Sequence, residues 1–471
     1  MPVRLDGLQS GMDTTALIGT MIDAQRIPYT RKENQIFDNE SKLYAWSQLD
    51  TKLTELNTKT VALNSYKTWQ QKTAASGDED ILTATATRDA ANGSYTITAS
   101  QLAQKHRIGS DSQASTTSEL GFSGDFTIGG ESVTVALTDT LKDVRDKIND
   151  ASANMDADEK VNATIIGTTL VLERDKTGAT NIDISEDGAN RVLRDLGVLS
   201  ETKDTDPATT YSTIETGRTL QTAEDLSANI NGVIYTGSEN TGITDAIEEV
   251  TLNFDNKSEG ETTTVDITND KETIKSLLNE FITAYNEAME LAENATSASI
   301  GSEDDELESL GILQGDSLAN EIRNKSRGII TAMETDPNNI DQAFNTLQKI
   351  GIWTSGRENR LSIVDEEALD DALENNFDEV EDLFRDYEGG VMRKMQTYTD
   401  SLIGPVDGLV VKRQTNLENN NDKLEDEIQE FEDSIPDKEA ELYERFAKME
   451  TQLAELQSAS GFIMSSLGGS K

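Results

Sequence analysis

Residues 424–463 read LEDEIQEFEDSIPDKEAELYERFAKMETQLAELQSASGFI, and an apolar side chain recurs there at every seventh position. Two sets of residues share this spacing: Ile428, Ile435, Leu442, Met449, Leu456 and Ile463, and beside them Leu424, Phe431 and Leu453. A sustained seven-residue repeat predicts a supercoiled helix with one apolar seam. The alternative is an amphipathic helix that packs on its own core. Pro436 lies inside the repeat, so we expect a kink or a helix restart capped near Ser434.

The N-terminal end of the chain carries a matching stripe. Asp13 is expected to cap a first helix, which has Leu17, Met21 and Ala24 on one face. Pro28 is expected to interrupt this helix, because proline has no backbone N–H. A second run of seam residues follows in steps of three and four: Trp46, Leu49, Leu53, Leu56, Thr60 and Leu63. The two terminal stripes can pair as antiparallel helices and still leave apolar surface for sister copies, so the termini are predicted to be an assembly element.

The middle of the chain shows the two-residue alternation of β-strands. A hairpin is expected between residues 82–87 and 94–98, because Asn92-Gly93 is a strong turn signal. Residues 126–184 are expected to fold as strand, strand, helix, strand and strand. A short helix is expected at 244–248, and the pattern becomes helical again after residue 270.

These patterns together predict an α+β fold, with a terminal coiled coil, a helical-bundle body and two β-rich heads inserted in the middle of the chain. The expected parts are an N-terminal coiled-coil half at 1–70, a β-hairpin part of the body at 71–105, a head domain at 106–200, a second head domain at 201–269, a helical-bundle part of the body at 270–408 and a C-terminal coiled-coil half at 409–471.

The composition excludes several classes of function. The chain has 471 residues with 88 acidic and 41 basic side chains, a net charge of -47, one histidine and no cysteine. A nucleic-acid partner is not expected, because phosphate binding needs an excess of Lys and Arg on some face. The acidic surplus is interpreted as a source of solubility. No membrane span is expected, because no apolar run approaches about 18 residues. The first residues also lack the pattern of a secretory signal peptide.

The sequence offers no catalytic or metal-binding constellation. His106 is expected to face solvent, and no motif marks a nucleophile beside it. Asp183, Asp187 and Gly188 match the opening of a calcium-binding loop, but the twelfth position is Arg194 in place of an acidic ligand. We therefore predict a protein that is not an enzyme and that needs no cofactor or metal.

Short motifs follow one another along the whole chain. They are SGMDTTAL at 10–17, AQRIP at 24–28, GSYTI at 93–97, QLAQ at 101–104, NGV at 231–233, VTL at 250–252, FITAYN at 281–286 and LQKIGI at 347–352. In this order they resemble the family of bacterial flagellar filament-capping proteins, also called flagellar hook-associated protein 2. The chain departs from the family pattern at Glu249, where the family often has glycine, and at Pro436, within a helix usually read as continuous.

The resemblance implies a homo-oligomeric ring at the distal tip of the flagellar filament, with terminal coils directed into the filament and heads spread as a plate. Flagellin subunits would arrive through a central channel and fold beneath this plate. Besides sister copies and flagellin, the implied partners are the hook–filament junction proteins and the flagellar export apparatus with its chaperone. The location would be extracellular, at the flagellum tip, after export without a cleaved signal peptide. Some members are adhesins, which adds host or surface glycans as partners of the heads.

Two other functions stay open at this point. One is another axial flagellar protein, either a hook–filament junction protein or a flagellin-like protein, because these also pair terminal coils. The other is a glycan-binding extracellular adhesin with coiled-coil stalks. Labelling of filaments would separate the first from a cap, and a glycan-binding or glycan-hydrolysis assay would test the second.

Overall fold

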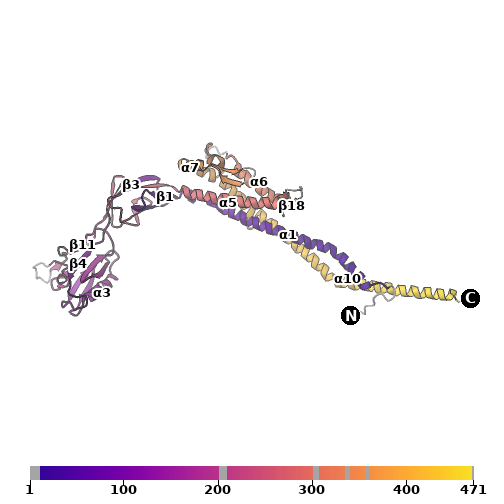
Figure 1. Ribbon diagram of the computed structural model, residues 1–471, viewed down its shortest axis with the longest axis horizontal. Coiled ribbons are helices and arrows are strands. Elements are labelled where there is room, and N and C mark those ends of the chain that lie inside the picture. Colours follow the sequence, from indigo (N-terminus) through magenta and orange to yellow (C-terminus); the bar gives the residue numbers. More distant parts are fainter. Residues whose placement is uncertain (1–10, 201–208, 301–306, 335–339, 356–359, 469–471) are drawn as a thin grey trace. The chain divides into compact units, whose positions relative to one another are not determined.

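A computed structural model describes residues 11–200, 209–300, 307–334, 340–355 and 360–468. The chain divides into two compact units, which we call the helical unit (1–68 and 271–471) and the β unit (69–270). The helical unit is therefore assembled from both ends of the chain, and the β unit is a continuous insertion between them (Figure 1). The expected α+β class is confirmed.

Long helices dominate the helical unit. They are α1 (Thr14–Asn64), α5 (Lys271–Thr296), α6 (Ser317–Thr331), α7 (Glu366–Asn375), α8 (Phe377–Arg385), α9 (Val391–Ile403) and α10 (Leu409–Gly468), and the single turn α2 (Tyr66–Trp69) lies at the boundary between the units. Small elements complete it: β17 (Ala298–Ile300), β18 (Leu307–Leu310), η1 (Leu347–Ile350), β19 (Ile352–Ser355) and β20 (Arg360–Ile363). Its core contains the fully buried Trp46, Phe281, Tyr285 and Phe384.

Local chemistry explains where several of these elements begin and how they are held. Asp13 caps α1 as expected, because its carboxylate accepts a hydrogen bond from the Ala16 N–H at 2.9 Å. Asn286, in the FITAYN motif on α5, holds strand β20. Its side-chain amide accepts from the Leu361 N–H at 2.7 Å and donates to the Leu361 carbonyl at 2.8 Å.

Neither proline in the terminal helices ends its helix. α1 continues through Pro28 and α10 continues through Pro436, so the expected interruption at Pro28 and the expected restart near Ser434 are wrong. The Ser434 hydroxyl does not cap a new helix, because it donates to the Phe431 carbonyl at 2.7 Å. Each proline removes one donor, and packing of one helix on the other outweighs this loss.

The β unit contains two groups of sheets. The first group has a five-stranded sheet in the order β1-β16-β3-β12-β13 and a three-stranded sheet in the order β14-β15-β2. Its strands are β1 (Lys72–Ser76), β2 (Leu82–Ala86), β3 (Gly93–Gln101), β12 (Leu226–Ile230), β13 (Val233–Gly237), β14 (Ile243–Ile247), β15 (Val250–Phe254) and β16 (Thr262–Asn269).

Long-range pairing overrides two local predictions in this group. β2 pairs with β15 and β3 pairs with β16 and β12, so the expected hairpin about Asn92-Gly93 does not form. The predicted helix at 244–248 is strand β14, because it pairs with β15. The strands of 71–105 therefore pair with the strands of 226–269, β12 to β16, and not with the helical bundle as expected.

Two motifs of this group have clear structural roles. The side chain of Asn240 pairs with the backbone of Ala103 in the QLAQ motif, accepting from its N–H at 2.8 Å and donating to its carbonyl at 2.9 Å. Glu249, where the sequence departs from the expected family pattern, has φ +62° in the turn between β14 and β15. Glycine adopts this conformation without a steric cost, so it is the residue that this turn would favour.

The second group forms the head with two four-stranded sheets, in the orders β10-β9-β5-β6 and β11-β4-β8-β7. Its elements are β4 (Arg107–Ser112), β5 (Gly124–Ile128), β6 (Glu131–Val135), α3 (Leu141–Ser152), β7 (Val161–Ile166), β8 (Thr169–Arg174), β9 (Ile184–Asp187), α4 (Val192–Asp195), β10 (Thr210–Tyr211) and β11 (Thr219–Gln221). The expected order of strand, strand, helix, strand and strand is confirmed. The expected boundary at residue 200 is not observed, because β10 and β11 complete the head sheets.

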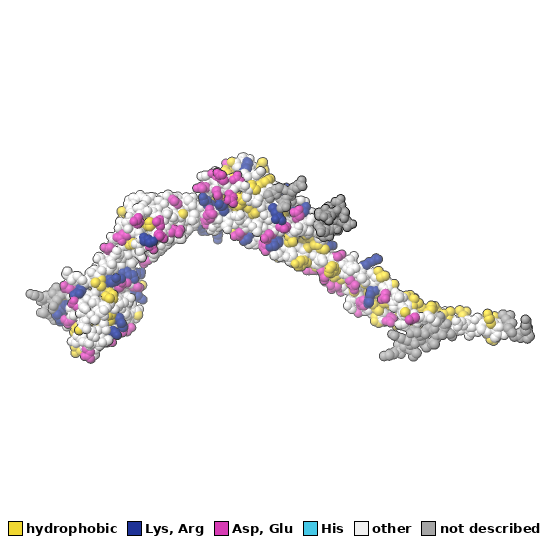
Figure 2. All heavy atoms as spheres, viewed as in Figure 1, with side chains coloured by type: hydrophobic (Ala, Val, Ile, Leu, Met, Phe, Trp, Pro, Cys, Tyr) yellow, Lys and Arg dark blue, Asp and Glu magenta, His cyan; other side chains and the backbone are white. Residues whose placement is uncertain are grey.

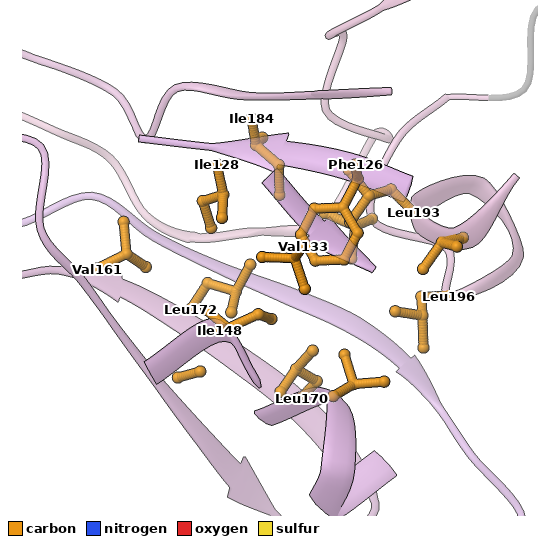
Figure 3. Close-up of a cluster of buried hydrophobic side chains, with 14 of the residues drawn as sticks. Phe126, Ile128, Val133, Ile148, Val161, Leu170, Leu172, Ile184, Leu193 and Leu196 are labelled. Carbon is orange, nitrogen blue, oxygen red and sulfur yellow. The ribbon is translucent and has the colours of Figure 1, made fainter. Parts of the chain in front are cut away.

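The head has a closed apolar core. Figure 3 shows side chains from both sheets and α3 pointing toward one another, among them Phe126, Val133, Ile148 and Leu172. All four are at most 3% exposed. The head therefore encloses this core cluster without help from a second chain.

Candidate functional site: the paired terminal helices

α1 and α10 run side by side in opposite directions (Figure 1). Five contacts fix their alignment: Arg26 with Glu432 (2.7 Å), Lys32 with Glu427, Tyr29 stacked on Phe431 (3.8 Å between ring centroids), Asn39 with Asn421 (2.8 Å) and Thr15 with Tyr443 (3.4 Å). The residue numbers in each pair sum to 458–460, as expected for antiparallel helices. The two ends of the chain thus meet as the stripes predicted.

The predicted seam residues differ in burial. Fully buried are Trp46, Leu49, Leu53, Leu56, Leu63 and Phe431, and half-buried are Leu424, Ile428, Ile435, Leu442, Met449 and Leu453. Most of the first set lies where α1 also packs against α5 and α9, and Lys52 and Lys59 form ion pairs there with Glu287 and Glu280 on α5 at 2.9 and 2.6 Å. Toward the start of α1, of the described helices only α1 and α10 pack together, so the seam between them is partly exposed.

At the start of α1 the predicted seam is displaced by one residue. Leu17 and Met21 are 40% and 39% exposed, whereas Ile18 and Ile22 are buried. The sequence presents two apolar stripes that are about 100° apart on the helix. The structure assigns the seam to the second stripe, and the first stays on the outer surface.

The last predicted seam residues lie beyond the paired segment. α1 begins at Thr14, which the alignment places opposite residue 445, and α10 continues to Gly468. Leu456 is 66% and Ile463 is 55% exposed. In the single chain these two residues are surface, so their predicted role in assembly stays a prediction.

Charge distinguishes the two helices. The part of α10 from Glu418 to Glu444 carries 12 acidic and 2 basic residues, whereas α1 carries six of each sign. Figure 2 shows carboxylates beside exposed hydrophobic side chains over this region. The balanced charge of α1 allows it to lie against the acidic α10. Two copies of α10 would repel each other, and salt would screen that repulsion.

A buried amide pair in the seam was missed by the sequence analysis. Asn39 and Asn421 are 8% and 7% exposed, and the Asn39 Nδ2 donates to the Asn421 Oδ1 at 2.8 Å. The signal was present, because Asn39 lies seven residues before Trp46 and Asn421 lies seven before Ile428. Extending both repeats by one period predicts a polar pair facing across the seam.

An exposed aromatic surface on α1 was also missed. Phe37 is 68% and Tyr44 is 70% exposed, and they are seven residues apart on one face. Tyr44 borders a groove of about 650 Å³ where α5 ends, and Leu291, Ala295 and Ile312 line it as well. This surface adds apolar area outside the seam, which is the kind of surface that protein partners cover.

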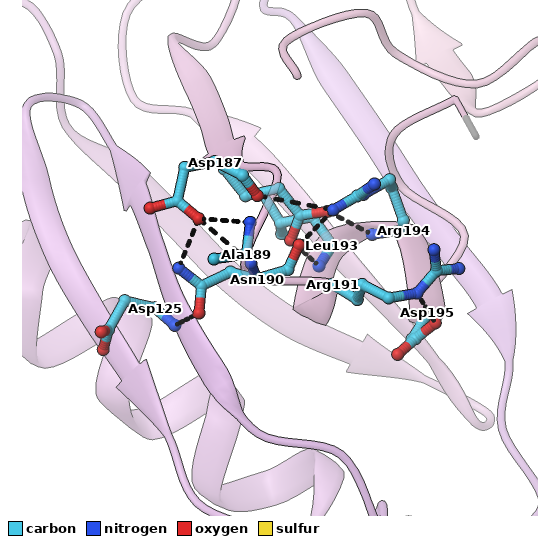
Figure 4. A network of polar contacts seen from close by, with 9 residues as sticks. Asp125, Asp187, Ala189, Asn190, Arg191, Leu193, Arg194 and Asp195 are labelled. Atoms are coloured by element: carbon cyan, nitrogen blue, oxygen red, sulfur yellow. Dashed lines mark hydrogen bonds and ion pairs between the residues drawn. The ribbon is translucent and has the colours of Figure 1, made fainter. Parts of the chain in front are cut away.

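The head contains a buried ion pair at the position where a calcium ligand is lacking. The Arg194 Nε donates to the Glu186 carboxylate at 2.7 Å, both side chains are at most 3% exposed, and the Tyr211 ring lies 3.9 Å from the guanidinium carbon. Figure 4 shows the guanidinium among the backbone groups of the Asp187–Asn190 loop. The arginine thus supplies a positive charge in this loop, which is the structural reason for Arg194 at the twelfth position.

His106 is not solvent-facing as predicted. It is 2% exposed, and its Nδ1 accepts a hydrogen bond from the Ile182 N–H at 2.9 Å. Burial, and then the charge of Arg174, lower the pKa of His106. The imidazole is therefore a neutral structural group of the head.

Within the described ranges no three His, Cys, Asp or Glu side chains gather as a metal site would require. Among the helices described, none combines the length and the apolar character needed to cross a bilayer. The paired helices thus remain the strongest candidate.

Comparison with known proteins connects this site to one family. A family model described as "Flagellar hook-associated protein 2 N-terminus" matches residues 10–106, and one described as "Flagellar hook-associated protein 2 C-terminus" matches residues 223–458. The A-type flagellar hook-associated protein 2 of Pseudomonas aeruginosa is 26% identical and covers 98% of this chain and 97% of its own length. The B-type protein of Pseudomonas aeruginosa PAO1 is 28% identical, with 86% and 85% covered.

A solved structure shares the fold. The D1-D2-D3 domains of the flagellar cap protein FliD from Escherichia coli align with a TM-score of 0.51 and 20% sequence identity. The alignment covers 79% of this chain and 99% of that one.

Proposed function

Because this chain belongs to the flagellar hook-associated protein 2 family, we propose that it caps the distal tip of a bacterial flagellar filament and promotes the insertion of flagellin beneath the cap. It is a structural protein of the flagellum, and its work is assembly rather than catalysis. The observation that carries the proposal is that the two family matches contain α1 entirely and most of α10, the two helices that meet in the candidate site.

The partly open seam supports self-association in the proposed ring. Ile428, Ile435 and Leu442 are only half-buried in the single chain, and burial of further apolar area by a neighbouring copy would stabilise it. We propose that the coil halves 1–70 and 409–471 form the leg of each subunit. In this proposal the predicted seam residues, including the exposed Leu456 and Ile463, contact sister copies or flagellin.

The finer parts of the proposal follow the family resemblance. Further partners are the hook–filament junction proteins and the flagellar export apparatus with its chaperone. The proposed location is the filament tip outside the cell, reached by export without a cleaved signal peptide. Binding of host or surface glycans by the head domains is also proposed from the resemblance, although among the described residues none marks a sugar site.

A truncation tests the leg. Removal of residues 1–66 together with 415–471 deletes the pair and leaves the β unit intact. In a strain that lacks its own cap protein, this variant is expected to restore neither filament growth nor swimming, whereas the full chain restores both. Circular dichroism of the purified variant controls for folding of the remaining part. Normal filaments from the folded variant would refute a role of the paired termini in capping.

Imaging separates a cap from other axial proteins. An epitope on the full chain should label only filament tips in electron micrographs. Label along the filament wall, or only at the hook junction, would contradict the cap and favour a flagellin-like or junction protein.

A further inference from the structure

The two helix prolines of the leg lie at the same level of the helix pair, although they are far apart in sequence. The alignment of α1 with α10 places Pro28 opposite residues 430–432 and Pro436 opposite residues 22–24. Proline has no N–H, so residue 28 cannot donate to the Ala24 carbonyl and residue 436 cannot donate to the Glu432 carbonyl. Both hydrogen-bond ladders are therefore interrupted within about two helical turns of each other.

A second observation marks the same segment of α10 as weak. Asp426 and Glu430, and then Asp433 and Asp437, are like-charged pairs four residues apart, and such pairs destabilise a helix. Figure 1 shows α10 changing direction between its start beside the bundle and its yellow C-terminal end. The helix continues through the segment, so any movement would be a bend rather than a break.

Cross-helix contacts hold this weak segment together. Tyr29 and Phe431 stack with an angle of 11° between their rings, and Lys438 lies 4.6 Å from the Phe431 ring centroid. Arg26 donates two hydrogen bonds to the Glu432 carboxylate, at 2.7 and 2.8 Å. Tyr29 and Arg26 thus lie on either side of Pro28 in α1, and both contact the stretch of α10 that precedes Pro436.

We propose that residues 24–31 of α1 and 428–438 of α10 form a hinge in the leg, and that the Tyr29–Phe431 stack is its clamp. The two helices bend together because both ladders are weakened at one level. The part of the leg beyond the hinge can then change direction while the bundle around Trp46 stays rigid. This inference does not depend on the capping function, because it concerns the isolated chain.

Distance measurements by electron paramagnetic resonance test the hinge directly. The chain contains no cysteine, so Asn416→Cys and Gln452→Cys, both at exposed positions of α10, place spin labels on either side of the hinge without further changes. A straight helix of this length would separate the labelled residues by about 54 Å. The full chain is expected to give a broad distribution centred below that value.

Two variants and a control complete the test. Pro28→Ala with Pro436→Ala should narrow the distribution and shift it toward 54 Å, the straight-helix estimate for that labelled separation. Tyr29→Ala with Phe431→Ala should broaden it, because the clamp is lost. Pro405→Ala, in the turn before α10, should leave it unchanged. Unchanged distributions in both double variants, with helix content preserved, would overturn the hinge. Failure of capping with a normal hinge would instead refute only the proposed function.

Discussion

The head and the leg bury hydrophobic residues in opposite ways. In the head two sheets and α3 enclose Phe126, Ile128 and Leu172, which are at most 2% exposed. In the leg the seam residues Ile428 and Ile435 are only half-buried, because two helices cannot enclose a core. The head therefore completes its hydrophobic core within one chain, whereas the leg keeps apolar surface that a second chain could cover.

The largest effect is expected at the buried ion pair of the head. Arg194→Ala leaves the Glu186 carboxylate buried without its charge partner, which should cost about 3–5 kcal/mol of the free energy of unfolding. Hydrogen exchange of the head, measured by mass spectrometry, reports the loss. The matched control is Arg145→Ala, whose ion pair with Asp146 is open to solvent, with side chains 32% and 58% exposed, and should be worth less than about 1 kcal/mol. Equal hydrogen exchange in the two variants would contradict the expected difference in stability between the buried and the exposed ion pair.

A pair of similar truncations compares the two regions directly. Leu172→Ala in the head should cost about 2–5 kcal/mol, because a fully buried side chain leaves a cavity. Ile428→Ala in the leg should cost only about 1 kcal/mol in the free chain, because that side chain is already half in water. Both changes in the free energy of unfolding are measured by denaturant titration, with hydrogen exchange used to monitor unfolding of each unit separately. The comparison fails if the leg variant proves as damaging as the head variant.

Acid should weaken the head before the helical unit. The folded-state pKa of His106 lies below its ordinary value of 6.5, so on acidification the unfolded chain binds this proton first. Its contribution is complete above pH 6.5 and is lost as the pH falls below that value, by at most about 1.4 kcal/mol per pH unit.

The helical unit has a pH-dependent contribution of the opposite sign. Burial raises the pKa of Glu334 above its ordinary value of 4.5, so this group contributes stability at low pH that is lost as the pH rises through the folded-state pKa. Unfolding of the head at pH 7.5 and 5.5, in the full chain and in His106→Gln, measures the histidine effect. A variant with the same pH dependence as the parent would exclude His106 as the cause.

The smallest change in stability is expected on the outer face of α1. Phe37→Ser should alter the free energy of unfolding by less than about 0.5 kcal/mol, because the ring is already exposed. Its effect should appear instead in self-association, measured by sedimentation at a protein concentration where the parent assembles. Tyr387→Ser, at a tyrosine that is 77% exposed, is the control. A large loss of stability would show that Phe37 supports the single chain after all.

Periodicity predicted the leg well where only one choice was open. Trp46, Leu53 and Ile428 follow an unambiguous repeat, and their helices pair as expected. At the start of α1 the sequence offers Leu17–Met21 and Ile18–Ile22 equally, and only the position of α10 decides between them. Local pattern cannot supply that information.

Long-range contacts explain the errors in the β unit. Residues 244–248 have helix-compatible side chains, but pairing with β15 makes them a strand. His106 lies in a polar sequence, Lys105-His106-Arg107. In the folded head it is nevertheless buried, and its hydrogen-bond donor, the Ile182 N–H, is 76 residues away in the sequence. The candidate site was found because its signal is a repeat within one helix, whereas these features depend on partners distant in sequence.

The insertion of the β unit between the two halves of the leg has a consequence for the order of folding. Asn39 and Asn421 are separated by 382 positions, so closing the leg requires a very long loop, whereas every strand of the head finds its partner within a much shorter stretch. Local contacts form faster than distant ones. If the chain emerges gradually from a narrow export channel, it would therefore fold its head first and pair α1 with α10 last. The assembly surface would then become available only once the whole molecule has arrived.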